Sequence, residues 1–381
     1  MAERNHFVAL DSLRGICASI VALYHFHTDA WLSGTKIIQH GFLFVDFFFV
    51  LSGFVIAANY SDKIISGFPI RKFLFLRLGR LYPLYIFMLA AYLALAVIKT
   101  IFNIQSGLDF SIAGFWANVF MVQAWIPKEG SDFWNPAAWS ISTEFWAYLA
   151  FALNCRMAKQ RNLIIFVALI SAAFLVLWFG TDRYLGVTSS ISAFARCIYS
   201  FGFGVITYAA WRRLKFNLSA MVTTMIELSV CGLGLLFVFF AGPSSMLAPP
   251  AFAAAILILA QRRGYTARFL EMGPLVLIGA LSYSIYMVHE FLLARLFNVL
   301  EFLSKRMTLP VVPDPQTFSI HNAIGYEHAS IVTMAIFYGL VFISSLLTYK
   351  MIEEPCREKS RKLANELFRS KMSPSPAPSR L

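Results

Sequence analysis

Long apolar runs, separated by short polar or charged segments, recur along the whole chain. Most of them reach the length of about 20 residues that a helix needs to cross the hydrocarbon core of a bilayer. This pattern predicts an all-α, polytopic integral membrane helical bundle with about ten transmembrane helices. The expected spans are 7–28, 41–60, 81–102, 136–154, 162–180, 192–211, 220–240, 245–261, 273–299 and 329–350.

Two segments depart from this pattern. The run at 112–127 is apolar but short and ends at Pro127, which indicates a re-entrant or interfacial helix. The charged stretch after residue 352 predicts a helix, and its end, SPSPAPSRL, has a composition typical of disorder. We therefore expect a transmembrane domain over 1–352 and a cytoplasmic charged tail over 353–381, with no appended soluble domain.

The composition excludes a soluble globular domain. Hydrophobic residues make up 59% of the chain and charged residues 14%, and the mean hydropathy is +0.66. A soluble chain of 381 residues could not bury so many apolar side chains. The five cysteines are scattered without a CxxC pair, so we expect neither a disulfide framework nor a metal site.

The positive charges predict the orientation. With the N-terminus inside, 23 of the 32 Lys and Arg residues fall on the inner side and 5 on the outer side. This asymmetry follows the positive-inside rule and predicts that both termini are cytoplasmic. The net charge of +12 then reflects topology and contact with anionic membrane lipids, not nucleic acid. The long connections at 103–135 and 300–328 fall outside, and loops of this length are often functional or disordered.

Ionisable residues inside the apolar runs are the main candidates for chemistry, because burying a charge in a membrane is costly. Arg14 and His25 are eleven residues apart, which places them on one face of a helix about 16 Å apart along its axis. Asp46 begins the next, antiparallel span and should come level with His25. A carboxylate beside an imidazole builds a general base. The alternative is a structural polar cluster that locks the two helices.

The predicted topology brings further polar side chains to the same outer half of the membrane. Glu144, Arg196 and His289 fall at the depth of His25 and Asp46, so we expect a polar chamber there. Hydroxyl and aromatic side chains in the same segments are candidates for its acceptor-facing lining. These candidates are Ser52, Trp139, Tyr148, Tyr283 and Tyr286. The pair Ser52–Gly53 could equally be a notch for close helix packing.

The inner side carries a different pattern. Arg77 and Arg80 are three residues apart and therefore neighbours on a helix face, near the level of Arg14. Guanidinium groups bind phosphate through paired hydrogen bonds, so these three arginines could hold a phosphorylated substrate. The alternative is that Arg77 and Arg80, like Arg71 and Lys72, serve topology and contact lipid headgroups.

Six segments together resemble the membrane-bound acyltransferase-3 family. They lie in order over 10–357 and read LDSLRGICASIVALYH, GFLFVDFFFVLSGFVI, FLRLGRLYPLY, WSISTEFWAY, LSYSIYMVH and IEEPCR. The resemblance implies a ten-helix core that uses cytosolic acyl-CoA, usually acetyl-CoA, to acylate a hydroxyl of an extracytoplasmic glycan. The family's Arg and His of the first helix match Arg14 and His25, and its paired basic motif matches Arg77 and Arg80. The chain resembles a stand-alone member without the SGNH-type domain of some relatives.

We therefore expect an O-acetyltransferase of the bacterial inner membrane, with His25, Asp46, Glu144 and Arg14 as catalytic candidates. Acetyl-CoA would be a co-substrate, no cofactor would stay bound, and the acceptor would be an O-antigen, an exopolysaccharide or a lipo-oligosaccharide. Succinyl transfer is an alternative. A transporter or flippase for a lipid-linked glycan is the rival of another class, but the sequence lacks the internal repeat typical of transporters. The absence of GxSxG, HExxH and P-loop motifs argues against serine hydrolases, zinc proteases and ATPases.

Overall fold

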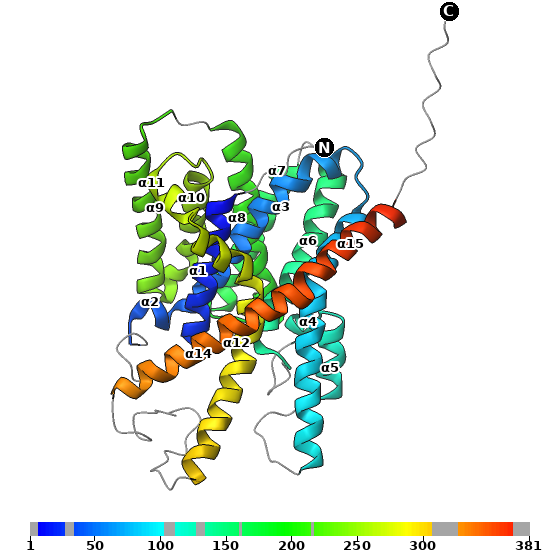
Figure 1. Ribbon diagram of the computed structural model, residues 1–381. Helices are drawn as coiled ribbons and strands as arrows, with labels where there is room; N and C mark the ends of the chain where they lie inside the picture. The colour runs from blue at the N-terminus through cyan, green and yellow to red at the C-terminus, as the bar shows by residue number, and fades with distance from the viewer. Residues whose placement is uncertain are drawn as a thin grey trace, which may run out of the picture.

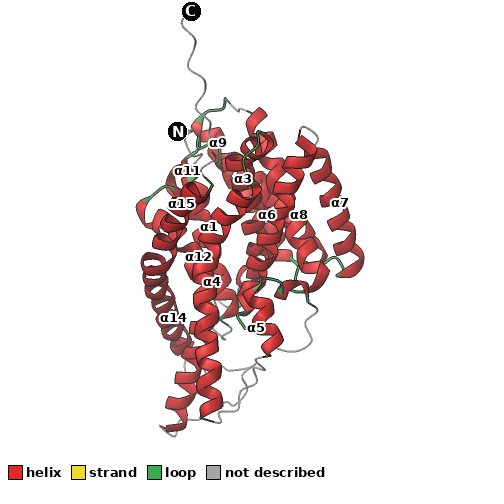
Figure 2. Cartoon of the chain, turned by 90° about the vertical axis from the view of Figure 1, so that its right-hand side faces the viewer, coloured by secondary structure: helices red, strands yellow, loops and turns green. Residues whose placement is uncertain are grey.

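The fold is a bundle of helices. The computed structural model describes residues 7–26, 34–102, 111–126, 134–159, 162–214, 217–306 and 327–368. Within these ranges the chain is almost entirely helical and contains no strand (Figures 1 and 2). The long helices are α1 (Val8–His25), α3 (Phe44–Ile65), α4 (Ile70–Ile101), α6 (Trp139–Ala158), α7 (Asn162–Gly180), α8 (Ser190–Arg213), α9 (Ala220–Phe240), α10 (Ala248–Leu259), α12 (Gly273–Arg306) and α14 (Glu327–Thr348).

Shorter elements connect or extend these helices. They are α2 (Lys36–Gln39), α5 (Ile112–Val119), α11 (Tyr265–Leu270), α15 (Glu354–Leu367), the 3-10 turns η1 (Gly41–Leu43), η2 (Gln123–Trp125), η3 (Pro136–Ala138) and η5 (Gly242–Leu247), and the π-helical turn η6 (Tyr349–Glu353). The eight residues of α5 extend only about 12 Å. This segment is therefore too short to cross a membrane, as the sequence predicts.

The protein crosses the membrane several times. In the described ranges, nine helical segments are long and apolar enough to be spans. The remaining predicted span corresponds to α6, which has 20 residues. Its polar residues, among them Ser140, Ser142, Thr143 and Glu144, lower its hydropathy below that of the others. Because α6 packs against α3, α4, α7 and α8, the bundle and not lipid surrounds these polar groups.

Two boundaries differ from the predicted ones. Helix α4 begins at Ile70 instead of 81 and continues through Pro83, so Arg77 and Arg80 lie inside a long helix. At the other end of the chain, α14 passes through η6 directly into α15, across the predicted boundary at residue 352. The helical start of the predicted tail is confirmed, and α15 packs against α4. The residues 103–110, 127–133, 307–326 and 369–381, which include parts of both long loops and the SPSPAPSRL end, lie outside the described ranges.

Close helix crossings position the candidate residues. A Cβ added at Gly15 of α1 would collide with the backbone of Ile278 and Gly279 in α12, so only glycine allows this approach. The same relation holds between Gly53 of α3 and Gly204 of α8, which confirms the packing notch predicted at Ser52–Gly53.

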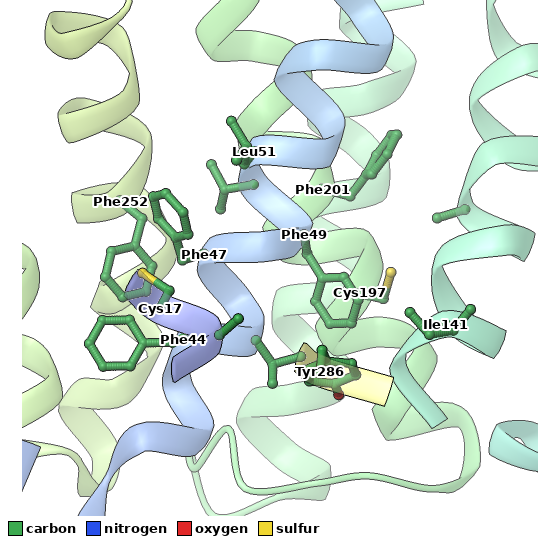
Figure 3. Packing of buried hydrophobic residues seen from close by; sticks show 14 of the residues in the cluster. Cys17, Phe44, Phe47, Phe49, Leu51, Ile141, Cys197, Phe201, Phe252 and Tyr286 are labelled. Carbon is green, nitrogen blue, oxygen red and sulfur yellow. The ribbon is translucent and has the colours of Figure 1, made fainter. Parts of the chain in front are cut away.

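Aromatic side chains fill the space around α3. Figure 3 shows Phe47 of α3 beside Phe252 of α10, and their ring centroids lie 5.7 Å apart. On another side of α3, Phe49 lies near Cys197 and Phe201 of α8 (Figure 3). These buried contacts hold α3, α8 and α10 in fixed positions and so fix the polar residues that α3 carries.

The start of α1 and the end of α15 lie toward the same end of the bundle (Figure 1). We expect both to be cytoplasmic. An impermeant thiol reagent should therefore label Asp182→Cys in intact cells and Lys359→Cys only after permeabilisation. Both variants are made in a background without the five free cysteines. Labelling of position 359, but not 182, in intact cells would contradict this orientation.

Candidate active site

His25, at the end of α1, belongs to a three-residue cluster. Its Nε2 atom lies 3.2 Å from Oε1 of Glu290. Its Nδ1 atom lies 2.9 Å from the carbonyl oxygen of Val21 and 3.2 Å from Nε2 of His289. We call His25, His289 and Glu290 the histidine cluster. Two of its members are adjacent in α12, so the close α1–α12 crossing assembles it.

The hydrogen bonds of the histidine cluster define its proton positions. His289 is fully buried, and its Nδ1 lies 2.7 Å from the carbonyl oxygen of Tyr286. A carbonyl only accepts, so Nδ1 of His289 carries a proton and its Nε2 offers a lone pair to His25. His25 then carries a proton on Nδ1, and its Nε2 faces the Glu290 carboxylate. A proton taken up at this Nε2 would be stabilised by the negative charge.

His25, His289 and Glu290 each offer one nitrogen or oxygen atom, and these three atoms lie within 4.8 Å of one another. A metal ion could also use this arrangement. The Nδ1 atoms of His25 and His289 face backbone carbonyls, which leaves their Nε2 atoms and the Glu290 carboxylate as the groups that could bind an ion. The contacts between the side chains of the cluster are equally those of hydrogen-bonded, proton-sharing groups.

The predicted partnership between Asp46 and His25 is wrong. The buried Asp46 carboxylate instead lies 2.7 Å from Nη2 of Arg196 and accepts a 2.9 Å hydrogen bond from Oγ of Ser200. Arg196 also donates to the carbonyl oxygen of Phe42, at 2.9 Å, and lies over the ring of Trp139. A depth count along the sequence gives the level of a residue but not the direction in which it points. Asp46, Arg196 and Trp139 therefore form a structural connection between α3, α8 and α6.

We expect Asp46→Asn to act mainly on stability. Removing one partner of a buried ion pair leaves the other charge uncompensated, which costs about 3–5 kcal/mol. The matched control is Asp62→Asn, because Asp62 pairs with Arg212 at 3.0 Å but is 67% exposed. Such exposed pairs contribute about 0–1 kcal/mol. Thermal unfolding in detergent should show a clearly lower melting temperature for Asp46→Asn alone. Equal melting temperatures would contradict the structural role.

A cavity of about 90 Å³ lies among α1, α3, α4, α6 and α12, and we call it the inner chamber. Its polar lining consists of Arg14, Ser52, Arg77, Arg80, Ser140, Glu144, Tyr148, Ser282, Tyr283 and Tyr286. A chain of hydrogen bonds crosses its wall: the Tyr148 hydroxyl donates to Oε1 of Glu144 at 2.5 Å and lies 2.9 Å from Oγ of Ser52. The inner chamber thus has hydrogen-bonding groups within a mainly apolar wall.

Tyr286 links the inner chamber to the histidine cluster. Its hydroxyl lies in the chamber wall, 2.8 Å from Oγ of Ser140. Its ring centroid is 5.8 Å from that of His289, whose Nδ1 it also binds through its carbonyl oxygen. A single residue, Tyr286, therefore contacts both the inner chamber and the histidine cluster.

A second, larger cavity of about 580 Å³ adjoins the first, and we call it the basic vestibule. Both cavities are lined by Arg14, Arg77 and Arg80, so these arginines stand where the two meet. The other charged residues of the vestibule lining are Asp11, Glu353, Arg357 and Arg361. Positive charge therefore predominates in the vestibule lining. Arg14, Arg77 and Arg80, which the sequence predicts to act together, lie together in the structure.

The three arginines at the junction are held differently. Arg14 donates to Oγ of Ser282 at 2.7 Å and lies 3.2 Å from Asp11. Arg77 donates to the hydroxyl of Tyr60 at 3.1 Å, while its Nε has no hydrogen-bond partner among the described residues. Arg80 lies within electrostatic range of Glu353 and Glu144. The guanidinium groups are positioned from two helices around one opening.

The polar groups thus form two levels instead of the single predicted chamber. His25 and His289 meet at one level, and most other candidates line the inner chamber at the next. Sequence reasoning missed Glu290, Ser282, Glu353 and Arg357. The segments LSYSIYMVH and IEEPCR, which carried the resemblance, adjoin or contain these residues and could have directed attention to them.

Comparisons with known proteins identify the family of the chain. A family profile described as an acyltransferase domain, Acyl_transf_3, matches residues 7–350, which is most of the chain. The chain belongs to this acyltransferase family. This membership is in line with the resemblance seen in the sequence.

The curated relatives that match the chain have low identity to it. The chain is 26% identical over 328 residues to O-acetyltransferase OatA of Staphylococcus aureus. The match covers 76% of the chain and 51% of the relative. The chain is 28% identical over 277 residues to acyltransferase MdmB of Streptomyces mycarofaciens, covering 65% of the chain and 67% of that protein. The chain thus spans about half the length of OatA. No solved structure matches it.

Proposed function

We propose that this acyltransferase takes an acyl group from acyl-CoA at its cytoplasmic end and transfers it to a hydroxyl of an extracytoplasmic glycan, across the bacterial plasma membrane. The main support for the proposal is the order of three features along the bundle. The basic vestibule adjoins the inner chamber, and Tyr286 in the chamber wall contacts the histidine cluster. Arginines able to bind phosphate, a small polar chamber and a histidine able to exchange a proton therefore follow one another along the bundle.

An acyl-CoA donor would fit this order of vestibule, chamber and histidine cluster. The pyrophosphate of acyl-CoA would bind Arg14, Arg77 and Arg80 at the junction of the cavities. The pantetheine arm would extend through the inner chamber, where Ser52, Glu144 and Tyr148 offer partners for its amide groups. Arg14 and His25 are separated by about 16 Å along α1, a distance that the extended arm can cover. The thioester would then reach His25.

The chamber also favours a short, uncharged acyl group. Its volume of about 90 Å³ is small, so a long acyl group would pass through it less readily than a short one. The Glu144 carboxylate in its wall would repel the free carboxylate of a succinyl group. Acetyl is therefore the proposed group, in keeping with the name of the relative O-acetyltransferase OatA.

The proposed chemistry uses Nε2 of His25 as the general base. It accepts the proton of the acceptor hydroxyl while the oxygen attacks the thioester carbonyl, and Glu290 stabilises the imidazolium that forms. The carbon–sulfur bond then breaks, the thiolate of CoA takes the proton from His25, and an ester and free CoA result. Glu144, which bonds Tyr148 in the chamber, would position the donor and not move the proton. Transfer through an acyl-His25 intermediate uses the same residues, and trapping labelled acyl on the protein would distinguish the two routes.

The acceptor class is tested with cells. Surface glycans from a strain with the gene should carry acetyl groups, detected by mass spectrometry, that a deletion strain lacks. Complementation with the wild-type gene should restore them. If deletion alters the amount of glycan at the surface but not its acylation, the protein acts as a flippase and the proposal is wrong.

A further inference from the structure

One face of α15 carries polar residues at intervals of four. Arg357, Arg361 and Asn365 continue a line that begins at Glu353 in η6, and residues four apart are neighbours on a helix face. All four line the basic vestibule. Helix α15 therefore forms a wall of this cavity, although the sequence suggested a charged tail beyond the transmembrane domain.

Helix α15 is held firmly in place against the bundle. A Cβ added at Gly79 of α4 would collide with the side chain of Ser360, so α4 and α15 touch directly. Glu353, which is 3% exposed, accepts a 3.1 Å hydrogen bond from Oγ of Ser284 in α12. The line of residues thus faces the vestibule in a fixed position.

The charge of the vestibule exceeds what one phosphate group requires. Five arginines line it, against Asp11 and Glu353. Arg357 lies 4.0 Å from Glu353 and 3.3 Å from the hydroxyl of Tyr349, and no described residue accepts a hydrogen bond from its buried Nε. The arginines divide into two groups, one on α1 and α4 at the mouth of the inner chamber and one on α15.

Coenzyme A carries its phosphates in two corresponding groups. The pyrophosphate adjoins the pantetheine arm, and a separate monoester stands at the ribose 3′ position, farther from the thioester. We propose that Arg357 and Arg361 form a subsite for this 3′-phosphate, an inference that rests on the proposed acyl-CoA donor. With the pyrophosphate at Arg14, Arg77 and Arg80, the nucleotide lies in the vestibule and its 3′-phosphate meets α15. The protein thereby selects acyl-CoA over phosphopantetheine carriers that lack this group.

The test compares two ligands on the full-length protein in nanodiscs. Binding of CoA and of 3′-dephospho-CoA is measured by isothermal titration calorimetry. A charge-assisted contact to phosphate corresponds to roughly a ten- to hundredfold change in affinity. Wild-type protein should therefore bind CoA at least tenfold more tightly. Arg357→Ala and Arg361→Ala should reduce this ratio, and the double variant should bring it close to one without changing the affinity for 3′-dephospho-CoA.

Lys362→Ala is the matched control, because Lys362 is an exposed cation of α15 that does not line the cavity, and it should keep the wild-type ratio. Unchanged affinity for 3′-dephospho-CoA also shows that a variant is folded. Equal binding of both ligands by wild type, or a wild-type ratio in the double variant, overturns the 3′-phosphate subsite alone. A wild-type ratio in the double variant would also be expected if Arg357 and Arg361 bind only lipid phosphates. Failure of wild type to bind either ligand overturns the subsite together with the proposed donor.

Discussion

His25→Gln protein should insert and fold like the wild type and yet transfer acyl groups about 10²–10⁴-fold more slowly. Glutamine can keep a hydrogen bond to the Val21 carbonyl, but it cannot take up a proton at the position of Nε2. The rate of acyl transfer from acyl-CoA, measured on purified protein of equal melting temperature, gives the comparison. His25→Ala should be equally slow. Glu290→Gln should lose less activity, because it removes the charge that stabilises the imidazolium but not the imidazole.

His40→Gln is the matched control for this experiment. His40 also places Nδ1 2.9 Å from a backbone carbonyl, that of Val238, but lies outside the histidine cluster. Its substitution should leave the transfer rate unchanged. Substantial activity in folded His25→Gln would show that the histidine cluster only connects α1 and α12.

Arg77→Ala and Arg80→Ala should raise the KM for acyl-CoA by roughly ten- to hundredfold, which is the effect expected for a lost charge-assisted contact to phosphate. Arg→Lys at either position should restore only part of the affinity, because lysine lacks the paired donors of guanidinium. Steady-state kinetics with varied acyl-CoA provides the measurement. Arg77 also binds Tyr60, so the melting temperature of each variant must be compared with that of wild type.

Arg71→Ala serves as the control on the same helix, since Arg71 is exposed and lines neither cavity. It should keep the wild-type KM. If Arg77→Ala and Arg80→Ala also keep it, these arginines serve topology and lipid contacts instead of donor binding.

The bundle could be predicted because the apolar period and run length are local properties of the sequence. The polar helix α6 shows where this information is insufficient. Its serines, threonine and Glu144 are tolerated because neighbouring helices surround them, and that shielding is a tertiary property. Helix α4 begins before the predicted span 81–102 for a related reason. Positive charges mark a membrane boundary, whereas a helix continues beyond this boundary wherever its backbone stays hydrogen-bonded.

The site could be predicted where it depends on a single helix. The helical period alone places Arg14 and His25 on one face and makes Arg77 a neighbour of Arg80. The partner of His25 depends instead on how α1, α3 and α12 are rotated, and the Gly15–Gly279 contact determines this rotation. That contact brings Glu290 to His25, while Asp46 points toward α8. The role of α15 likewise depends on its packing at Gly79.

Transfer across the membrane is measured most directly in sealed vesicles from cells that produce the protein and its glycan. Acetyl-CoA labelled in the acetyl group is impermeant, so it reaches the basic vestibule only in inverted vesicles. The account predicts labelled glycan in inverted vesicles with wild-type protein, and almost none in right-side-out vesicles or with His25→Gln. Equal labelling in both vesicle orientations, or labelling by His25→Gln at the wild-type rate, would contradict it.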